Sequence, residues 1–184
     1  MGLDMYFTKK YYIWSQNREG VKIPGVKGVN SRKVKEISED AGYWRKANAI
    51  HGWFVENVQD GEDDCKEYLV DQEQMIELLN TVNKVLKASK LVKGKVYGGT
   101  KFEGGKSTII WEDGKVIENP KVAKELLPVT GGFFFGNYDE DQNPYDQYYL
   151  EDLKNTKKIL ETALASTKEK NNEVAVDFYY SSSW

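Results

Sequence analysis

Residues 71–88 carry the pattern that most restricts how this chain can fold. Apolar side chains recur there at steps of three and four residues, at Met75, Leu78, Leu79, Val82, Val85 and Leu86. This spacing puts them on one stripe of an α-helix, and such a stripe must be buried against a second layer. Asp71, followed three residues later by Gln74, forms a capping-box pattern. The sequence therefore predicts a long helix packed against a core.

The remaining pattern consists of short strands interrupted irregularly by helices. Strands are expected at residues 3–8, 11–14, 34–37, 68–70, 133–135 and 174–180. Gly-rich strands are expected at 95–97, 107–112 and 115–118, with turns at Gly98-Gly99 and Asp113-Gly114. Helices are expected at 43–58, at 120–127 and from Asn143-Pro144 onward. This order predicts an α+β fold with a mixed or antiparallel sheet, about three main helices and a Gly-rich β-hairpin unit.

Length and composition predict one soluble domain. The 184 residues fall within the range of a single domain, so we expect residues 1–184 to form one α+β domain with a β-hairpin insertion at 93–118. No apolar run approaches the roughly 20 residues of a membrane-spanning helix, and the first residues lack the features of a secretory signal. The single Cys65 cannot form an internal disulfide. We therefore expect a cytoplasmic protein that does not bind membranes.

Several motifs approach known phosphate or metal sites but fail in detail. Residues 99–108 end in Gly-Lys-Ser, like a phosphate-binding loop, but Thr100 replaces the first glycine and the following residues are strand-like. One His and one Cys cannot build the cage of a structural zinc. Asp139, Asp141 and Asn143 have calcium-loop spacing but lack the glycine of the sharp turn. No cofactor or metal is expected.

The single histidine, His51, allows one catalytic hypothesis. An imidazole beside Cys65 could activate the thiol as a nucleophile, with Asp40 or Asn48 orienting the ring. On a helical wheel, however, His51 falls within an apolar stripe that includes Phe54. That position favours a packed, hydrogen-bonded imidazole. Cys65 and His51 are the catalytic candidates, and a non-catalytic role is favoured.

The same wheel places Trp53 opposite the stripe, on a face shared with Arg45 and Lys46. An exposed indole beside basic residues can stack on a base or anchor a protein interface. The alternative is that another element of the chain covers the ring. The predicted binding site is therefore centred on Trp53, Arg45 and Lys46. It also includes Tyr43, Asn57, Asp60, Glu62, Asp63 and Asp64.

Charge is unevenly distributed, although the formal net charge is only -3. Basic residues crowd the first fifth of the chain, at Lys9, Lys10, Arg18, Lys22, Lys27, Arg32, Lys33 and Lys35. Acidic residues gather at 60–64 and 139–152. This asymmetry fits a charged partner, and the basic arm could make phosphate contacts to nucleic acid. The alternatives are solvated faces and, at 60–64, weak binding of a hard cation.

Three segments together resemble a known group of sequences. They are Met1–Tyr6, the block that runs from Tyr43–Asn48 to Asp60–Cys65, and Gly132–Gly136. They resemble small uncharacterised proteins of bacteriophages and prophages from gut and soil bacteria, and the likeness spans most of the chain outside 16–32 and 93–116. Such proteins often bind and disable a host component, and the chain is also similar to phage inhibitors of Cas9. The resemblance implies an antagonist, with acidic stretches suited to a cationic nucleic-acid channel, but it transfers no catalytic chemistry.

Three functional hypotheses follow. The leading one is a non-catalytic phage accessory protein that inhibits a host protein or ribonucleoprotein, such as a CRISPR nuclease. The second is a binder of a nucleotide signal, with Trp53 or Tyr43 stacking on the base and Arg45 or Lys46 on the phosphate. The third is an enzyme that uses Cys65 and His51. The sequence carries no signal for the oligomeric state.

Overall fold

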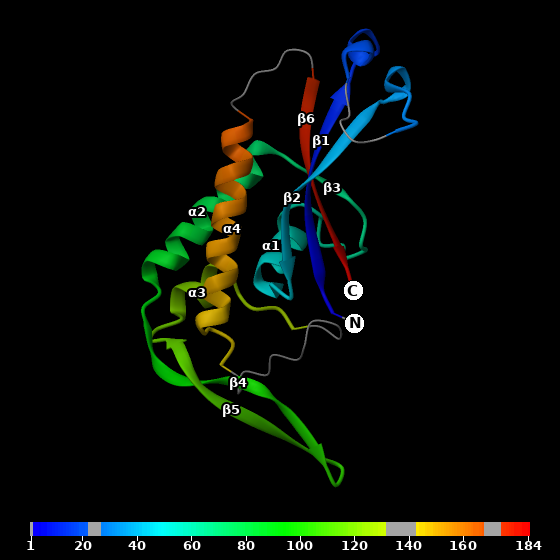
Figure 1. Ribbon diagram of the computed structural model, residues 1–184. Coiled ribbons are helices and arrows are strands. Elements are labelled where there is room, and N and C mark those ends of the chain that lie inside the picture. The colour runs from blue at the N-terminus through cyan, green and yellow to red at the C-terminus, as the bar shows by residue number, and fades with distance from the viewer. Residues whose placement is uncertain (1, 22–26, 132–142, 168–173) are drawn as a thin grey trace.

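The computed structural model describes residues 2–21, 27–131, 143–167 and 174–184. Its central element is a four-stranded antiparallel sheet in the order β2-β1-β6-β3. The strands are β1 (Asp4–Ile13), β2 (Glu36–Arg45), β3 (Tyr68–Val70) and β6 (Val174–Ser183). The last strand, β6, pairs with the first along its whole length, so both ends of the chain lie close together (Figure 1).

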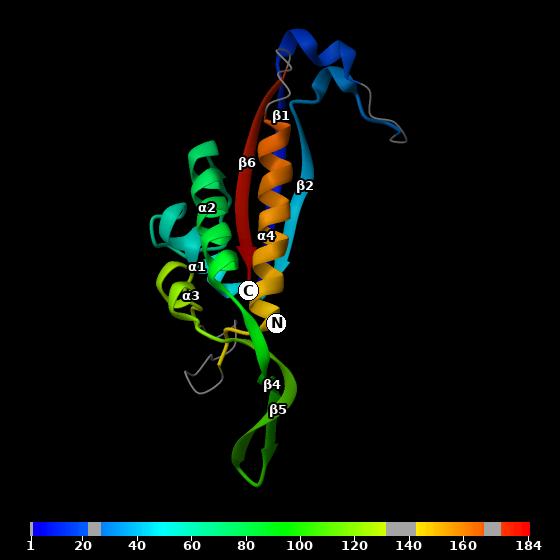
Figure 2. The same ribbon diagram turned by 90° about the vertical axis from the view of Figure 1, so that its left-hand side faces the viewer.

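Helices cover one face of this sheet. They are α1 (Asn48–Asn57), α2 (Gln72–Ala88), the short α3 (Lys121–Leu126) and α4 (Gln147–Ser166). Helices α2 and α4 pack side by side in front of the strands (Figure 2). Two 3₁₀ turns, η1 (Ser15–Gly20) and η2 (Ser31–Lys33), lie at the far end of β1 and β2. The predicted α+β class with an antiparallel sheet is confirmed.

The apolar stripe of α2 is buried as predicted. Met75, Leu78, Val82 and Val85 are buried, while Leu79 and Leu86 pack partly buried against the same core. The capping box is complete. An Asp71 carboxylate oxygen accepts from the Gln74 amide at 2.8 Å, and the Gln74 side-chain oxygen accepts from the Asp71 amide at 2.9 Å. These two reciprocal hydrogen bonds fix the start of α2 immediately after β3.

A second, two-stranded sheet projects from the body. It consists of β4 (Leu91–Glu103) and β5 (Lys106–Ile117), and we call it the ribbon. Both views show it extending away from the helices, at the opposite end from η1 and η2 (Figures 1 and 2). The hairpin expected at 93–118 is therefore present, but as one long unit whose turn is at Gly104 and Gly105.

The two turns predicted inside this hairpin are wrong. Gly98 forms a bulge between Tyr97 and Gly99, and Asp113 pairs with Lys95 in the middle of the ribbon. The physical reason is at the tip, where Gly104 and Gly105 have φ of 57° and 77°. A two-residue turn with both φ positive matches the twist of the flanking strands, and glycine adopts it without strain.

Other boundaries also differ from the sequence predictions. The strands expected at 3–8 and 11–14 are one strand, and β2 continues through Tyr43–Arg45, so the predicted helix 43–58 begins only at Asn48. Lys46, with φ of 59°, makes the change of direction between them. Helix α4 begins at Gln147 behind an Asp146 cap, not at Asn143-Pro144. The strand expected at 133–135 lies outside the described residues. Within the described ranges, no helix combines the length and apolar character needed to cross a membrane.

Candidate functional site

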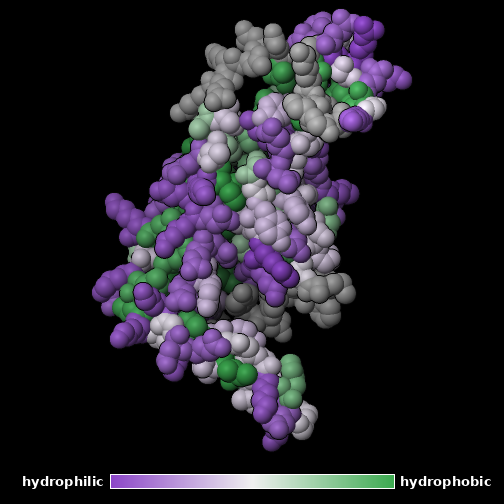
Figure 3. Space-filling view, viewed as in Figure 1, coloured by the Kyte–Doolittle hydropathy of each residue, from purple (hydrophilic) through white to green (hydrophobic). Residues whose placement is uncertain are grey.

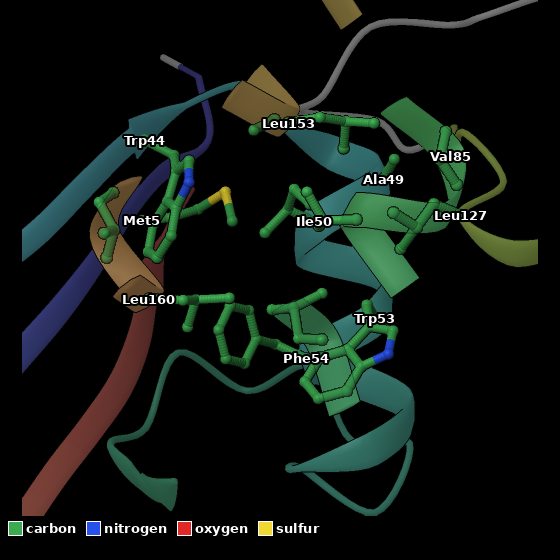
Figure 4. Packing of buried hydrophobic residues seen from close by; sticks show 14 of the residues in the cluster. Met5, Trp44, Ala49, Ile50, Trp53, Phe54, Val85, Leu127, Leu153 and Leu160 are labelled. Atoms are coloured by element: carbon green, nitrogen blue, oxygen red, sulfur yellow. The ribbon is translucent and has the colours of Figure 1, made fainter. Parts of the chain in front are cut away.

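The prediction that Trp53 points outward is wrong, because its side chain is buried at 9% exposure. Its ring packs edge-on against Phe54, with 5.5 Å between the centroids, among the core side chains of Figure 4. The predicted apolar stripe included Trp44, which belongs to β2 and not to the helix, so the stripe was misaligned on α1. In α1, Phe54 packs into the central core, while Trp53 lines a hollow together with Leu126, the last residue of α3, and Leu127, which follows it. Another element of the chain covers the indole, as the alternative interpretation required.

The other predicted binding residues do not form one site. Tyr43, Arg45 and Lys46 are exposed before α1, whereas Asn57, Asp60 and Glu62 are exposed at or beyond its other end. A helix of ten residues is about 15 Å long, so the two groups are separated along α1. Asp63 is partly buried, and Asp64 pairs with Lys66, a hydrogen bond that lowers the pKa of Asp64.

His51 lies in a hydrogen-bonded cluster inside the fold. Its Nδ1 is 2.7 Å from the Tyr180 hydroxyl, and its Nε2 is 3.0 Å from a carboxylate oxygen of Asp63. The other Asp63 oxygen accepts from the Trp184 indole at 3.1 Å. Burial raises the pKa of Tyr180 well above its ordinary value, so the hydroxyl keeps its hydrogen. A carboxylate only accepts, so in the neutral ring the nitrogen facing Asp63 is the donor and Nδ1 accepts from the Tyr180 hydroxyl. Nε2 then carries the hydrogen that is donated to Asp63.

The cluster confirms a packed, hydrogen-bonded His51 and does not support the Cys65 nucleophile. Asp63 and Tyr180 hold the ring, not Asp40 or Asn48. Because both ring nitrogens have partners, the neutral imidazole has no lone pair left to accept a thiol proton. Cys65 itself is exposed. Across the described parts of the chain, no three His, Cys, Asp or Glu side chains gather in a way that could hold a metal ion.

Much of the basic N-terminal arm is engaged with neighbouring groups. Lys10 pairs with Glu36 and Glu67, and Arg32 pairs with Glu19 at 3.2 Å. Lys27, Lys33 and Lys35 are exposed, and Lys22 lies outside the described residues. Binding of nucleic acid by this arm stays a prediction, and its charge lies at the opposite end of the molecule from the ribbon.

The ribbon carries a row of exposed aromatic rings that sequence reasoning missed. Tyr97 pairs with Trp111, and the bulge at Gly98 resets the register so that Phe102, paired with Ser107, lies on the same face. The Tyr97 hydroxyl is 2.7 Å from the Thr100 hydroxyl, which lies on this face too. Tyr97, Trp111 and Phe102 are 37%, 40% and 81% exposed. We call this the ring face of the ribbon.

The ring face is also basic. The register places Lys93, Lys95 and Lys115 on it with a single acid, Asp113, which pairs with Lys95 at 2.7 Å. Lys93 and Lys115 stand directly opposite each other, an arrangement that costs stability unless an anion lies nearby. The surface view shows hydrophobic residues among hydrophilic ones along the ribbon (Figure 3). The alternation of rings and lysines is present in the sequence, but it assigns them to one face only when the turn is placed at Gly104 and Gly105.

No protein-family model, no curated protein and no solved structure matches this chain.

Proposed function

We propose that this chain is a non-catalytic protein that binds and inhibits a host macromolecule, and that the ring face of the ribbon is its contact surface. The observation that carries the proposal is the row of Tyr97, Trp111 and Phe102, exposed on an element that projects from the body. The resemblance to phage accessory proteins favours a host defence ribonucleoprotein, such as a guide-loaded CRISPR nuclease, as the partner.

The chemistry of the ring face fits such a partner. Large rings are the commonest anchors of protein interfaces and also stack on unpaired bases. Lys93 and Lys115 would each find an anionic group in the nucleic-acid component or in an acidic protein surface. Since the ribbon is narrow and projects from the body, it can enter a groove that the body cannot. Occupying a substrate channel in this way would block the nuclease without any chemical step.

The experiment measures binding to, and inhibition of, purified Cas9 with and without its guide RNA. The ring-face variant Phe102→Ala with Trp111→Ala is compared with the control Trp14→Ala, because Trp14 is 53% exposed at the opposite end of the molecule. Loss of interface anchors costs about 2 kcal/mol or more, which is roughly a 30-fold weaker Kd. We expect that loss in the ring-face variant and wild-type affinity in the control.

Two results would overturn the proposal. Wild-type affinity in a folded ring-face variant would remove the ribbon as the contact surface. Failure of the wild-type chain to bind any of a panel of guide-loaded defence nucleases would remove the partner class.

The two other hypotheses lose support from the geometry. The nucleotide-signal hypothesis loses Trp53, whose ring is enclosed, and keeps Tyr43, which is 48% exposed and whose hydroxyl donates to Asp4. The enzyme hypothesis relied on His51 as a base, and both its ring nitrogens are occupied.

A further inference from the structure

The base of the ring face contains an open hollow where its lysines stand. The hollow lies over the backbone of Gly94 and Gly114, which pair directly across the ribbon. Five polar side chains complete its wall, those of Lys93, Lys95, Lys115, Asp113 and Gln147. Its volume is about 700 Å³, so it has room for a solvated anionic group. We call it the lysine hollow.

The lysine hollow holds more positive charge than its single acid neutralises. Asp113 pairs with Lys95, which leaves Lys93 and Lys115 without an ion pair in the described parts of the chain. These two residues stand directly opposite each other, and opposed Cβ atoms in an antiparallel pair are only about 5 Å apart. The Gln147 side-chain oxygen accepts from the Lys115 amide at 3.1 Å, so its NH₂ group is left to donate. Two cations and an amide donor therefore suit an oxyanion.

The exposed rings follow further along the same face, toward the tip of the ribbon. A strand rises about 3.4 Å per residue, so Trp111 lies about 14 Å from Lys115 along β5. Ser107, which pairs with Phe102, lies about 14 Å beyond Trp111. The face thus presents charge at its base, one ring pair in the middle and one ring near the tip.

The opposite face of the ribbon lacks this order. The register places no aromatic residue on it, and its charged residues are two lysines and two acids, Lys101, Lys106, Glu103 and Glu112. Lys101 pairs with Glu103 at 2.8 Å. The excess of positive charge and the rings are therefore both confined to one face of the same element, and this face is the one that a ligand would contact.

A line of cations followed by rings suits a polymer that carries both anionic and flat groups along one backbone. Single-stranded nucleic acid has this character, and proteins bind it by placing cations along the phosphates and stacking bases on aromatic side chains. An acidic protein surface would satisfy Lys93 and Lys115 but gives the rings no flat partner. In a duplex the base faces are already stacked on one another. The combination therefore favours an unpaired strand.

We propose that the ring face binds single-stranded nucleic acid directly, with a phosphate in the lysine hollow and bases stacked on the rings of Tyr97, Trp111 and Phe102. This inference rests on the proposed function, since it names the component of the host ribonucleoprotein that the ribbon contacts. That component is an unpaired stretch of the guide or of its target strand.

Fluorescence anisotropy with the full chain tests the inference without any nuclease. The probes are labelled single-stranded RNA and DNA of about 12 nucleotides and mixed sequence, within the range of known binding sites, and a duplex of the same sequence. We expect at least one single strand to bind at least about tenfold more tightly than the duplex, because stacking needs free base faces. Comparison of RNA with DNA reports whether the 2′-hydroxyl contributes.

The lysine hollow is tested by salt dependence. For single strands the slope of log affinity against log salt is about −0.7 per neutralised phosphate. Lys93→Gln combined with Lys115→Gln should therefore make the slope shallower by up to about 1.4. The matched control, Lys101→Gln combined with Lys106→Gln, removes the same charge from the opposite face and should keep the wild-type slope.

The rings are tested by affinity at constant salt. Phe102→Ala combined with Trp111→Ala should weaken binding at least about tenfold and leave the salt slope unchanged, because stacking is lost while the phosphate contacts remain. Ile110→Ala is the control, since Ile110 is 45% exposed on the opposite face, and it should bind like the wild type. Circular dichroism confirms that each variant is folded.

The inference is overturned if the wild-type chain binds no single strand. Equal affinity for single strand and duplex would also overturn it, as would wild-type affinity and salt slope in the folded ring and lysine variants. These failures differ from failure of the proposed function. If the ring face is needed to bind a guide-loaded nuclease but no free strand binds, the proposed function stands and the contact is with protein. If a strand binds through the ring face but no nuclease is bound, the inference stands and the partner class is removed.

Discussion

The helix-covered sheet and the ribbon are both built from long antiparallel strands, but they place their aromatic residues in opposite environments. In the sheet region, Phe54 lies flat on Tyr180, with 3.9 Å between ring centroids and 8° between planes, and both residues are 0% exposed. In the ribbon, Trp111 and Phe102 stay 40% and 81% exposed. The same residue type therefore stabilises the fold in one region and is left available for contact in the other.

The difference lies in what covers each sheet. Strands β1 and β6 are packed under helices, so alternate residues enter a core. The ribbon is joined to the body at its base, where the Ile117 amide donates to the Tyr145 carbonyl at 2.9 Å and the Lys115 amide to the Gln147 side chain at 3.1 Å. A two-stranded ribbon is only marginally stable in water by itself. The base bonds hold its direction, and the rings beyond them have no packing role comparable to that of Phe54.

The largest expected effect tests the buried member of this comparison. Phe54→Ala should lower the free energy of unfolding by about 3–5 kcal/mol, because it removes a ring that contacts Phe7, Trp44 and Tyr180 and leaves a cavity. Urea unfolding followed by circular dichroism measures the loss. A change below about 1 kcal/mol would mean that Phe54 is not enclosed as the structure shows.

The sequence was sufficient where a pattern is local. The α2 stripe, its capping box and strand β3 were predicted because each depends on residues within a few positions of one another. The sequence was not sufficient where the environment comes from distant parts of the chain. Trp53 was misplaced because the wheel could not show that residues after α3 would cover it.

The ring face and the cavity at the starts of α1 and α4 show the same limit. The ring face appears only when the register of β4 and β5 is known, since one bulge decides which side Phe102 takes. The cavity is lined by Asn48 and Asp152, which are far apart in the sequence and belong to different helices. Neither residue type is unusual by itself, so no sequence signal marked the cavity.

The next expected effect is a pH dependence of stability, and it compares Asp152 in the helix-covered region with Asp113 on the ribbon. The pKa of Asp152 rises from 3.8 to about 7 in the folded protein. The folded state therefore keeps a proton that the unfolded state releases, and stability falls as pH rises through this window. At about 1.4 kcal/mol per pH unit, the loss reaches up to about 4 kcal/mol and is complete above about pH 7. Asp152→Asn should remove this fall and unfold at higher urea than wild type at alkaline pH.

Asp113→Asn supplies the matched control on the ribbon. The Asp113 side chain is 92% exposed, and its ion pair with Lys95 is screened by water. Asp113→Asn should therefore change the free energy of unfolding by less than about 0.5 kcal/mol. Unfolding curves across pH for the three proteins give the comparison directly. An equal slope in wild type and Asp152→Asn would show that the buried carboxyl does not carry the pH dependence.

The smallest expected effect concerns Phe102, the exposed member of the comparison. It receives the same Phe→Ala substitution as Phe54 in the core. Phe102→Ala should change the free energy of unfolding by less than about 0.5 kcal/mol, because its ring is 81% exposed beside the turn and removes little surface from water. Urea unfolding in parallel with Phe54→Ala measures both values. A loss of 2 kcal/mol or more would show that Phe102 packs against the chain itself. A near-zero loss leaves the ring without a structural role, so any loss of partner binding by this variant reports a direct contact of the ring face.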